Sequence, residues 1–160
     1  TSDDRGRKTV MQLVDNACDE RIYPVGRLDR NTTGLLLFTN DGDLAKKLLH
    51  PKHGVRKIYH VTLDKKLAKD HLNAIAEGVE LEDGIAPVDS VSYIDGSSRD
   101  QVGVELHIGR NRIVRRIFES LGYQVVHLDR VVFGNLTKKD VKRGSWKHLD
   151  KKELELLRML

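Results

Sequence analysis

The chain has 160 residues, of which 39% are hydrophobic and 32% charged, so it is long enough to bury one core. It has a single cysteine, Cys18, and no apolar run near the roughly 20 residues that cross a bilayer. No N-terminal stretch has the pattern of a secretion signal. These features exclude membrane, disulfide-scaffold and collagen-like classes, and they predict a soluble, cytoplasmic protein.

Charge is distributed unevenly along the chain. The formal net charge is only +4, but residues 110–148 hold ten Lys/Arg against three Asp/Glu, whereas residues 61–100 hold four against nine. Local Lys/Arg density, more than total charge, sets affinity for phosphates. The pattern favours a polyanion such as RNA bound on one side, with solvated charged faces as the alternative.

Hydrophobic periodicity predicts short helices and strands that alternate along the chain. Asp43 is the expected N-cap of the second helix, and Pro51 is expected to stop it. The mixture indicates one integrated α+β domain with helices against a mixed sheet. The expected helices span residues 9–19, 43–50, 67–77, 112–121 and from about 150; the expected strands or extended segments span residues 34–39, 57–63, 86–93, 102–108, 125–133 and a piece around 146.

A helical wheel of residues 112–121 separates apolar from basic side chains. Ile113, Ile117 and their apolar neighbours share one face, while Arg112, Arg115 and Arg116 share the other. Glu119 is the only nearby acid, so these guanidinium groups are expected to be largely unpaired within the helix. The wheel predicts a basic binding face, with an ordinary surface helix as the alternative.

The loop at residues 26–34 precedes a predicted buried strand, which would support it rigidly. Asp29 lies between Arg27 and Arg30, and nearby positive charge keeps a carboxylate ionised and available as a nucleophile or base. The residues alone leave two interpretations open for Asp29: a catalytic carboxylate, or an Asx-turn or cap.

Three segments together resemble a known family. Gly26–Ala45 with Leu49-His50-Pro51 resembles the nucleophile motif of pseudouridine synthases of the RsuA/RluB/E/F family. Lys57–Val61 resembles the family's second motif and Gly109–Arg116 its third. The resemblance keeps the order of the motifs and covers the chain from about Asp4. It implies the pseudouridine synthase fold: a mixed, mainly antiparallel sheet flanked by short helices, with an active-site cleft across the sheet.

The resemblance also implies a cofactor-free isomerase that converts uridine in RNA to its C-glycoside. Asp29 matches the catalytic aspartate, and the resemblance leaves open whether it adds to the base or acts on the sugar. Tyr59 matches the tyrosine that stacks on the target base and takes part in proton transfer; without the family it would be read as a core tyrosine. Arg115 matches the arginine that pairs with the aspartate.

Further residues match positions that bind RNA. Arg27 corresponds to the arginine that helps to extrude the target nucleotide, a step required for chemistry on a stacked base. Leu128 belongs to the pocket-lining segment, and the Lys138–Lys147 stretch would contact phosphates. The expected RNA-binding residues are Arg27, Arg30, Lys57, Arg110, Arg112, Arg116, Leu128 and Arg130.

The expected partner is ribosomal RNA, and Asn111-Arg112 with residues 143–146 resembles the branch that modifies the large subunit. We expect a monomer, no membrane association, no cofactor and no metal, since the seven histidines show no ligand spacing. Relatives carry an S4-type RNA-binding module and an opening strand before the position of Thr1, so residues 1–160 are expected to be a catalytic domain without that module.

Two other functions remain as alternatives. A non-catalytic ribosomal-RNA-binding or assembly module would need the arginines but not the carboxylate of Asp29. A metal-dependent nuclease would use Asp29, Asp41, Asp43 and His50, but turn and helix-cap roles explain those residues better.

Overall fold

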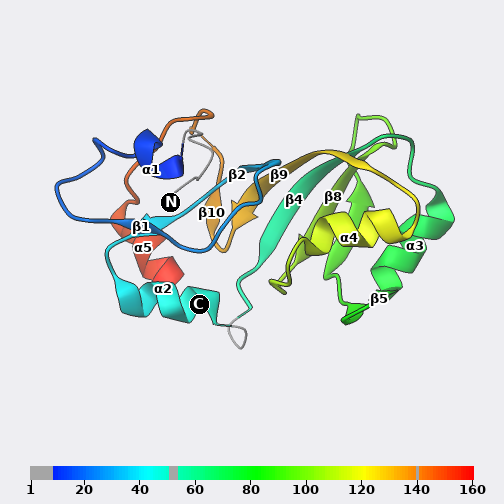
Figure 1. Ribbon diagram of the computed structural model, residues 1–160, viewed down its shortest axis with the longest axis horizontal. Coiled ribbons are helices and arrows are strands. Elements are labelled where there is room, and N and C mark those ends of the chain that lie inside the picture. The colour runs from blue at the N-terminus through cyan, green and yellow to red at the C-terminus, as the bar shows by residue number, and fades with distance from the viewer. Residues whose placement is uncertain (1–8, 51–53, 140) are drawn as a thin grey trace.

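The computed structural model describes residues 9–50, 54–139 and 141–160 (Figure 1). In chain order the elements are α1 (Val10–Leu13), β1 (Tyr23–Pro24), β2 (Thr32–Gly34), β3 (Phe38–Thr39), α2 (Gly42–Leu49), β4 (Lys57–Leu63), α3 (Lys69–Glu77), β5 (Val79–Leu81), β6 (Gly84–Ala86), β7 (Ser90–Tyr93), β8 (Gln101–Leu106), α4 (Ile113–Ser120), β9 (Val125–Phe133), β10 (Leu136–Thr137) and α5 (Lys151–Arg158).

The main sheet has the order β10-β9-β4-β8-β7, and β2 pairs with β9 outside this path. The β2–β9 pair is parallel, and the other pairs of this sheet are antiparallel. Two short pairs, β1–β3 and β5–β6, lie apart from it. The α+β fold with a mixed, mainly antiparallel sheet is therefore confirmed.

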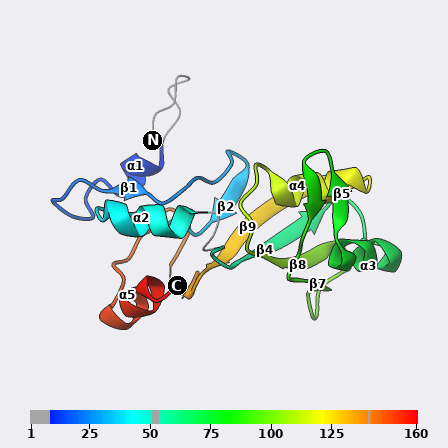
Figure 2. The same cartoon turned by 90° about the horizontal axis from the view of Figure 1, so that it is seen from below.

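The molecule has two halves, which β9 joins (Figures 1 and 2). One core packs α3 and α4 against β4 and β8, and Phe118 and Val61 are fully buried within it. The other core gathers around α2 and α5, with Leu157 at its centre. Leu128 of β9 belongs to the first core and Phe133 of the same strand to the second, so β9 ties the two together.

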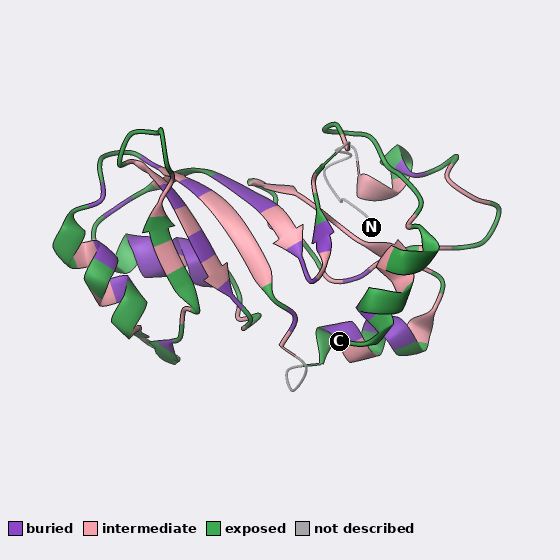
Figure 3. Ribbon diagram, turned by 180° about the vertical axis from the view of Figure 1, so that it is seen from behind, coloured by how far each residue is buried: buried purple, intermediate pink, exposed green. Residues whose placement is uncertain are grey.

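Strand β8 has the alternating pattern of burial that its sequence predicts. Val102, Val104 and Leu106 are buried, while the residues between them are only half-buried, which produces the banding of the central strands in Figure 3. Successive side chains of a strand point to opposite faces, so every second residue enters the core. The predictions for β4, β8, β9, α3, α4 and α5 are confirmed to within a few residues.

The predicted strand at residues 34–39 is wrong as a single element. The chain pairs with β9 up to Gly34 and then leaves that strand, before Phe38–Thr39 pairs with β1. Gly34 has a φ of +119°, a conformation that glycine adopts without steric cost. An apolar run does not reveal such a break, because both parts are similarly buried.

Two helix predictions also need correction. The first helix ends at Leu13, not near residue 19, and turns that contain Asp15 and Asn16 follow it, in keeping with the turn preference of such residues. The N-cap of α2 is Asp41, whose carboxylate accepts a hydrogen bond from the Leu44 amide at 3.0 Å, whereas Asp43 lies within the first turn. Pro51, the expected stop, lies outside the described residues.

Two extended segments differ from expectation as well. Residues 86–93 are not one strand: Ala86 ends the β5–β6 hairpin, and β7 begins at Ser90. The segment around Trp146 forms no strand. Within the described ranges, no helix has both the length and the apolar character needed to span a membrane.

Candidate active site

A cavity of about 840 Å³ lies between the two halves of the molecule. It falls within the range of about 300–1,000 Å³ that is typical of small-ligand pockets. Arg30 and Arg116 are absent from its lining. The other predicted site residues line it together: Arg27, Asp29, Lys57, Tyr59, Arg110, Arg112, Arg115, Leu128 and Arg130.

Asp29 is held in a tight turn at the entrance to β2. The Thr32 amide donates to the Asp29 carbonyl at 2.8 Å, and Thr32 then begins the parallel pairing with β9. At the other end of β2, a Cβ on Gly34 would overlap the backbone of Arg130, so the two strands approach very closely. The Asp29 loop is therefore anchored to the centre of the main sheet.

Tyr59 projects into the cavity from β4. Its Cα is paired with Val104 of β8 and with Arg130 of β9, and a register shift lies between Ile58 and Tyr59. Such irregularities re-aim side chains and are frequent next to active sites. Burial raises the pKa of Tyr59; the charge of Arg130 and a side-chain hydrogen bond with it oppose the shift, and the Asp29 carboxylate adds to it. The phenol is therefore electrostatically coupled to both residues.

Arg115 is buried, at 7% exposed, and this corrects the helical wheel, which placed it on an open basic face. The Asp29 turn and the start of β9 lie against Arg115, whereas Arg112 stays exposed. The guanidinium donates to the carbonyl of Asn31 at 2.8 Å and to that of Val125 at 3.3 Å. Its Nε has no partner among the described residues.

The expected direct pair between Arg115 and Asp29 is not among the ion pairs of the described residues. Burial, followed by the charge of Arg112, lowers the pKa of Arg115, and the Asp29 carboxylate opposes this shift. Arg115 therefore interacts electrostatically with the Asp29 carboxylate, while it donates a hydrogen bond to the backbone carbonyl of Asn31, two residues further along the same turn.

The turn before α4 forms another wall of the cavity. Arg112 has a φ of 50° and is the only non-glycine residue with positive φ in the described part of the chain. Strained backbone of this kind often occurs at functional sites. Arg112 is also 3.6 Å from Glu119, so it is not wholly unpaired.

Arg110 and Arg116 are held by the β5–β6 hairpin. Arg116 makes a two-pronged bond to the Asp83 carboxylate, at 2.9 and 3.1 Å, while Arg110 donates to the carbonyls of Asp83 and Ile85. The hydrogen bond from Arg116 is the main cause of the lowered pKa of Asp83. Sequence reasoning missed Asp83; its only signal was its place in the acidic block at residues 61–100.

The remaining predicted RNA-binding residues differ in exposure. Arg27 and Arg30 are exposed, whereas Leu128 and Arg130 are buried. Lys57 donates to the Ile108 carbonyl at 3.2 Å; burial and, secondarily, the charge of Arg130 lower its pKa. Arg27 and Arg30 thus lie at the surface, while the buried Leu128 and Arg130 line the cavity.

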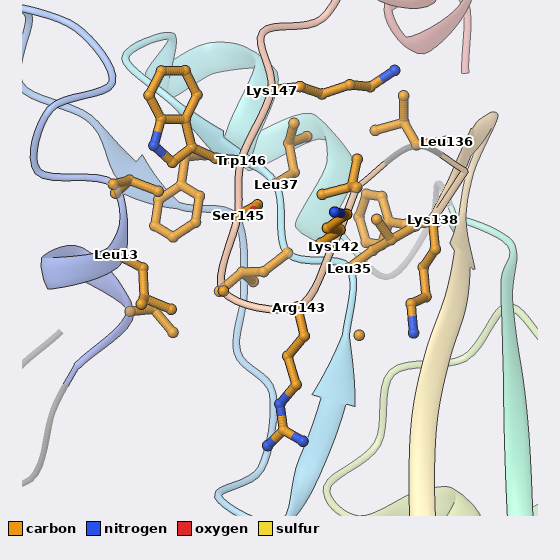
Figure 4. Close-up of a pocket in the computed structure, with 18 of the residues that line it drawn as sticks. Leu13, Leu35, Leu37, Leu136, Lys138, Lys142, Arg143, Ser145, Trp146 and Lys147 are labelled. Carbon is orange, nitrogen blue, oxygen red and sulfur yellow. The ribbon is translucent and has the colours of Figure 1, made fainter.

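A second cavity, of about 450 Å³, is lined by residues from segments 10–38 and 127–153 (Figure 4). Leucines from α1 and from the segment after β2 line it, and the loop that carries Lys142, Arg143 and Trp146 borders it. Asp29, Tyr59 and Arg115 do not line it. Across the described residues, no three His, Cys, Asp or Glu side chains are grouped so that they could hold a metal ion in either place.

Comparison with known proteins identifies the family of the chain. Residues 1–120 match the RNA pseudouridylate synthase family. The chain is 42% identical, over 99% of its length, to ribosomal large subunit pseudouridine synthase B of Yersinia pestis, and covers 51% of that protein. It is 37% identical over 99% of its length to the Bacillus subtilis protein of the same name, and covers 66% of it.

A crystal structure of a pseudouridylate synthase superposes with a TM-score of 0.82 at 32% identity, over 93% of this chain and 65% of that one. The chain thus spans about half to two thirds of the length of these relatives. The match includes all three motifs that line the 840 Å³ cavity. The chain belongs to the RNA pseudouridylate synthase family.

Proposed function

We propose that this protein isomerises a uridine of ribosomal RNA to pseudouridine. In this reaction the N1–C1′ bond breaks, the bound base rotates and a C5–C1′ bond forms, while the proton on C5 is lost and N1 gains one. No atom is gained or lost overall, so the protein must supply a nucleophile, a proton path and a closed site. One observation carries the proposal: the carboxylate, the phenol and the guanidinium expected from three separate motifs line one cavity.

Asp29 is proposed as the nucleophile. Its turn is fixed by β2 and by the Arg115 bond to the Asn31 carbonyl, so the backbone that carries the carboxylate has little freedom. Preorganisation of this kind reduces the entropic cost of reaching the transition state. Arg115 stabilises the negative charge of Asp29 from nearby and holds its turn, which replaces the direct pair expected from the resemblance.

Tyr59 is proposed to stack on the target base and to exchange the proton at C5. Its ring gives an apolar surface, and its hydroxyl is a polar tip within the same cavity. A flipped nucleoside must leave the RNA stack, and the exposed Arg27 at the cavity is proposed to occupy the gap that it leaves. Arg30, Arg112 and the Lys138–Lys147 stretch are proposed to bind phosphates.

The proposed substrate is large-subunit ribosomal RNA, on the strength of the names of the Yersinia pestis and Bacillus subtilis relatives. The proposed functional unit is one copy of the chain, because one copy is enough to bring Asp29, Tyr59 and Arg115 to the same cavity.

Pseudouridine formation by Asp29→Asn tests the proposal. We expect turnover on ribosomal RNA to fall below detection while RNA affinity changes less than about threefold, because the substitution removes the nucleophile and keeps the shape. Asp43→Asn is the matched control, since this exposed carboxylate belongs to α2 and does not line the cavity. Full turnover by a folded Asp29→Asn protein would refute the assignment.

The same assay separates the alternatives. A non-catalytic RNA-binding module would form no pseudouridine with the unmodified protein, whatever its affinity for RNA. A metal-dependent nuclease would cleave the RNA and would lose activity in EDTA. The proposal predicts intact RNA and turnover that EDTA does not abolish.

A further inference from the structure

Arg130 lies where the strands that carry Asp29 and Tyr59 meet. On one side its Cα is paired with Gly34, at the end of the strand that follows the Asp29 turn. On the other side it is paired with Tyr59 of β4. It is 5% exposed, so its charge is enclosed by these neighbours.

Both the backbone and the side chain of Arg130 form hydrogen bonds with Leu35, just after β2. The Leu35 amide donates to the Arg130 carbonyl at 2.9 Å, and Nε and Nη2 of Arg130 donate to the Leu35 carbonyl at 2.9 and 2.6 Å. The guanidinium also lies 4.9 Å from the centre of the Phe133 ring. These contacts fix its plane. The pairing of Arg130 with Tyr59 across β9 and β4 places the two side chains on the same face of the sheet, and both line the cavity.

This environment argues against a phosphate contact as the main role of Arg130. Its surface is almost entirely covered, and two of its nitrogens, Nε and Nη2, already donate to Leu35. Burying a guanidinium is costly unless its hydrogen bonds are satisfied. A rigid fork that bonds two groups at once is a property of arginine that lysine lacks.

From this geometry we propose that Arg130 is a positioning residue for catalysis: it fixes the Tyr59 hydroxyl relative to the Asp29 loop and stabilises the phenol when it gives up its proton. This inference deepens the proposed function and rests on it. The electrostatics agree, since Arg130 opposes the upward pKa shift that burial imposes on Tyr59.

A double-mutant cycle with Arg130→Met and Tyr59→Phe tests the inference on ribosomal RNA. We expect Arg130→Met alone to lower kcat by about tenfold or more, with KM changed less than about threefold. In the Tyr59→Phe background the same change should alter kcat by less than about threefold, because the hydroxyl on which Arg130 acts is gone. Equal losses in both backgrounds would overturn the inference and assign Arg130 to the Leu35 contact alone.

Arg99→Met is the matched control. Arg99 is also an arginine against a tyrosine, 5.0 Å from the Tyr93 ring, but it is exposed and does not line the cavity. It should leave kcat unchanged. Arg130→Lys serves if the methionine variant does not fold: it keeps the charge without the fork, so we expect the same non-additive pattern with a smaller loss. Additive losses in this variant would count against the inference equally.

A titration without RNA separates this inference from the proposed function. The ultraviolet absorbance of each protein, minus that of its Tyr59→Phe counterpart, follows the ionisation of Tyr59 alone. Because Arg130 lowers the pKa of this phenol, the midpoint should move to higher pH in Arg130→Met and stay in place in Arg99→Met. An unmoved midpoint in Arg130→Met would overturn the inference and leave the proposed function standing. Absence of turnover in the unmodified protein would overturn the proposed function, and with it the catalytic role of Arg130, whatever the midpoint.

Discussion

Gly34→Ala tests how the Asp29 loop is attached to the sheet. The φ of +119° places this residue in a region where an L side chain is strained, at a cost of about 1–3 kcal/mol. The new Cβ would also overlap backbone atoms of Arg130, including the carbonyl carbon at 2.8 Å. Overpacking against groups that cannot move aside costs about 1–3 kcal/mol more. We therefore expect a total loss of about 2–6 kcal/mol, a large part of the stability of a typical domain.

Thermal unfolding followed by circular dichroism measures this loss. For a chain of this size, each kcal/mol lowers Tm by about 2–4 °C, so we expect a fall of about 4–24 °C. Gly122→Ala is the control, because Gly122 has a φ of +91° but no atom within 4 Å of the added Cβ. It should show the strain without the overlap. Equal losses in the two variants would refute the close approach of β2 to β9.

Three further outcomes are expected. Asp41→Ala should lower the stability of the protein by about 1 kcal/mol because it removes the cap of α2, and Asp43→Ala should cost less; urea unfolding compares them, and the reverse order would contradict the corrected cap. Burial alone would raise the pKa of Asp129, but hydrogen bonds outweigh it and lower the pKa. The stability that the ionised Asp129 contributes is therefore present above its unfolded-state pKa near 3.9 and is lost as pH falls through its folded-state pKa. Asp129→Asn should therefore unfold at a lower urea concentration than the unmodified protein at pH 7, and the difference between the two urea midpoints should narrow near pH 3. A difference that does not change with pH would contradict this. Asp83→Asn should accelerate amide hydrogen exchange at residues 109–112, because it weakens the ion pairs of Asp83 with Arg110 and Arg116. Unchanged exchange would show that this turn does not depend on Asp83.

The fold was predictable where burial follows a simple period. The alternation of β8 and the apolar stripe of α4 each identified an element, since each buries one face against the same core. The break at Gly34 was not predictable from the apolar run, because it depends on the partner strand that approaches there.

The sequence predicted which residues line the candidate site, but not the contacts that hold them in place. The motifs identified Asp29, Tyr59 and Arg115, which do line one cavity. A wheel describes only one helix, so it could not show that the Asp29 turn covers Arg115, nor that Asp83 comes from a distant hairpin to hold Arg116. These contacts join residues 33 to 84 positions apart, and no local pattern encodes them.

A structure of the Asp29→Asn protein bound to a ribosomal RNA fragment that contains the target uridine tests the central claim most directly. The account predicts one nucleoside swung out of the RNA into the 840 Å³ cavity, its base against the Tyr59 ring and its glycosidic bond beside residue 29. A target base that stays stacked in the RNA, or that enters the second cavity beside Trp146, would contradict it.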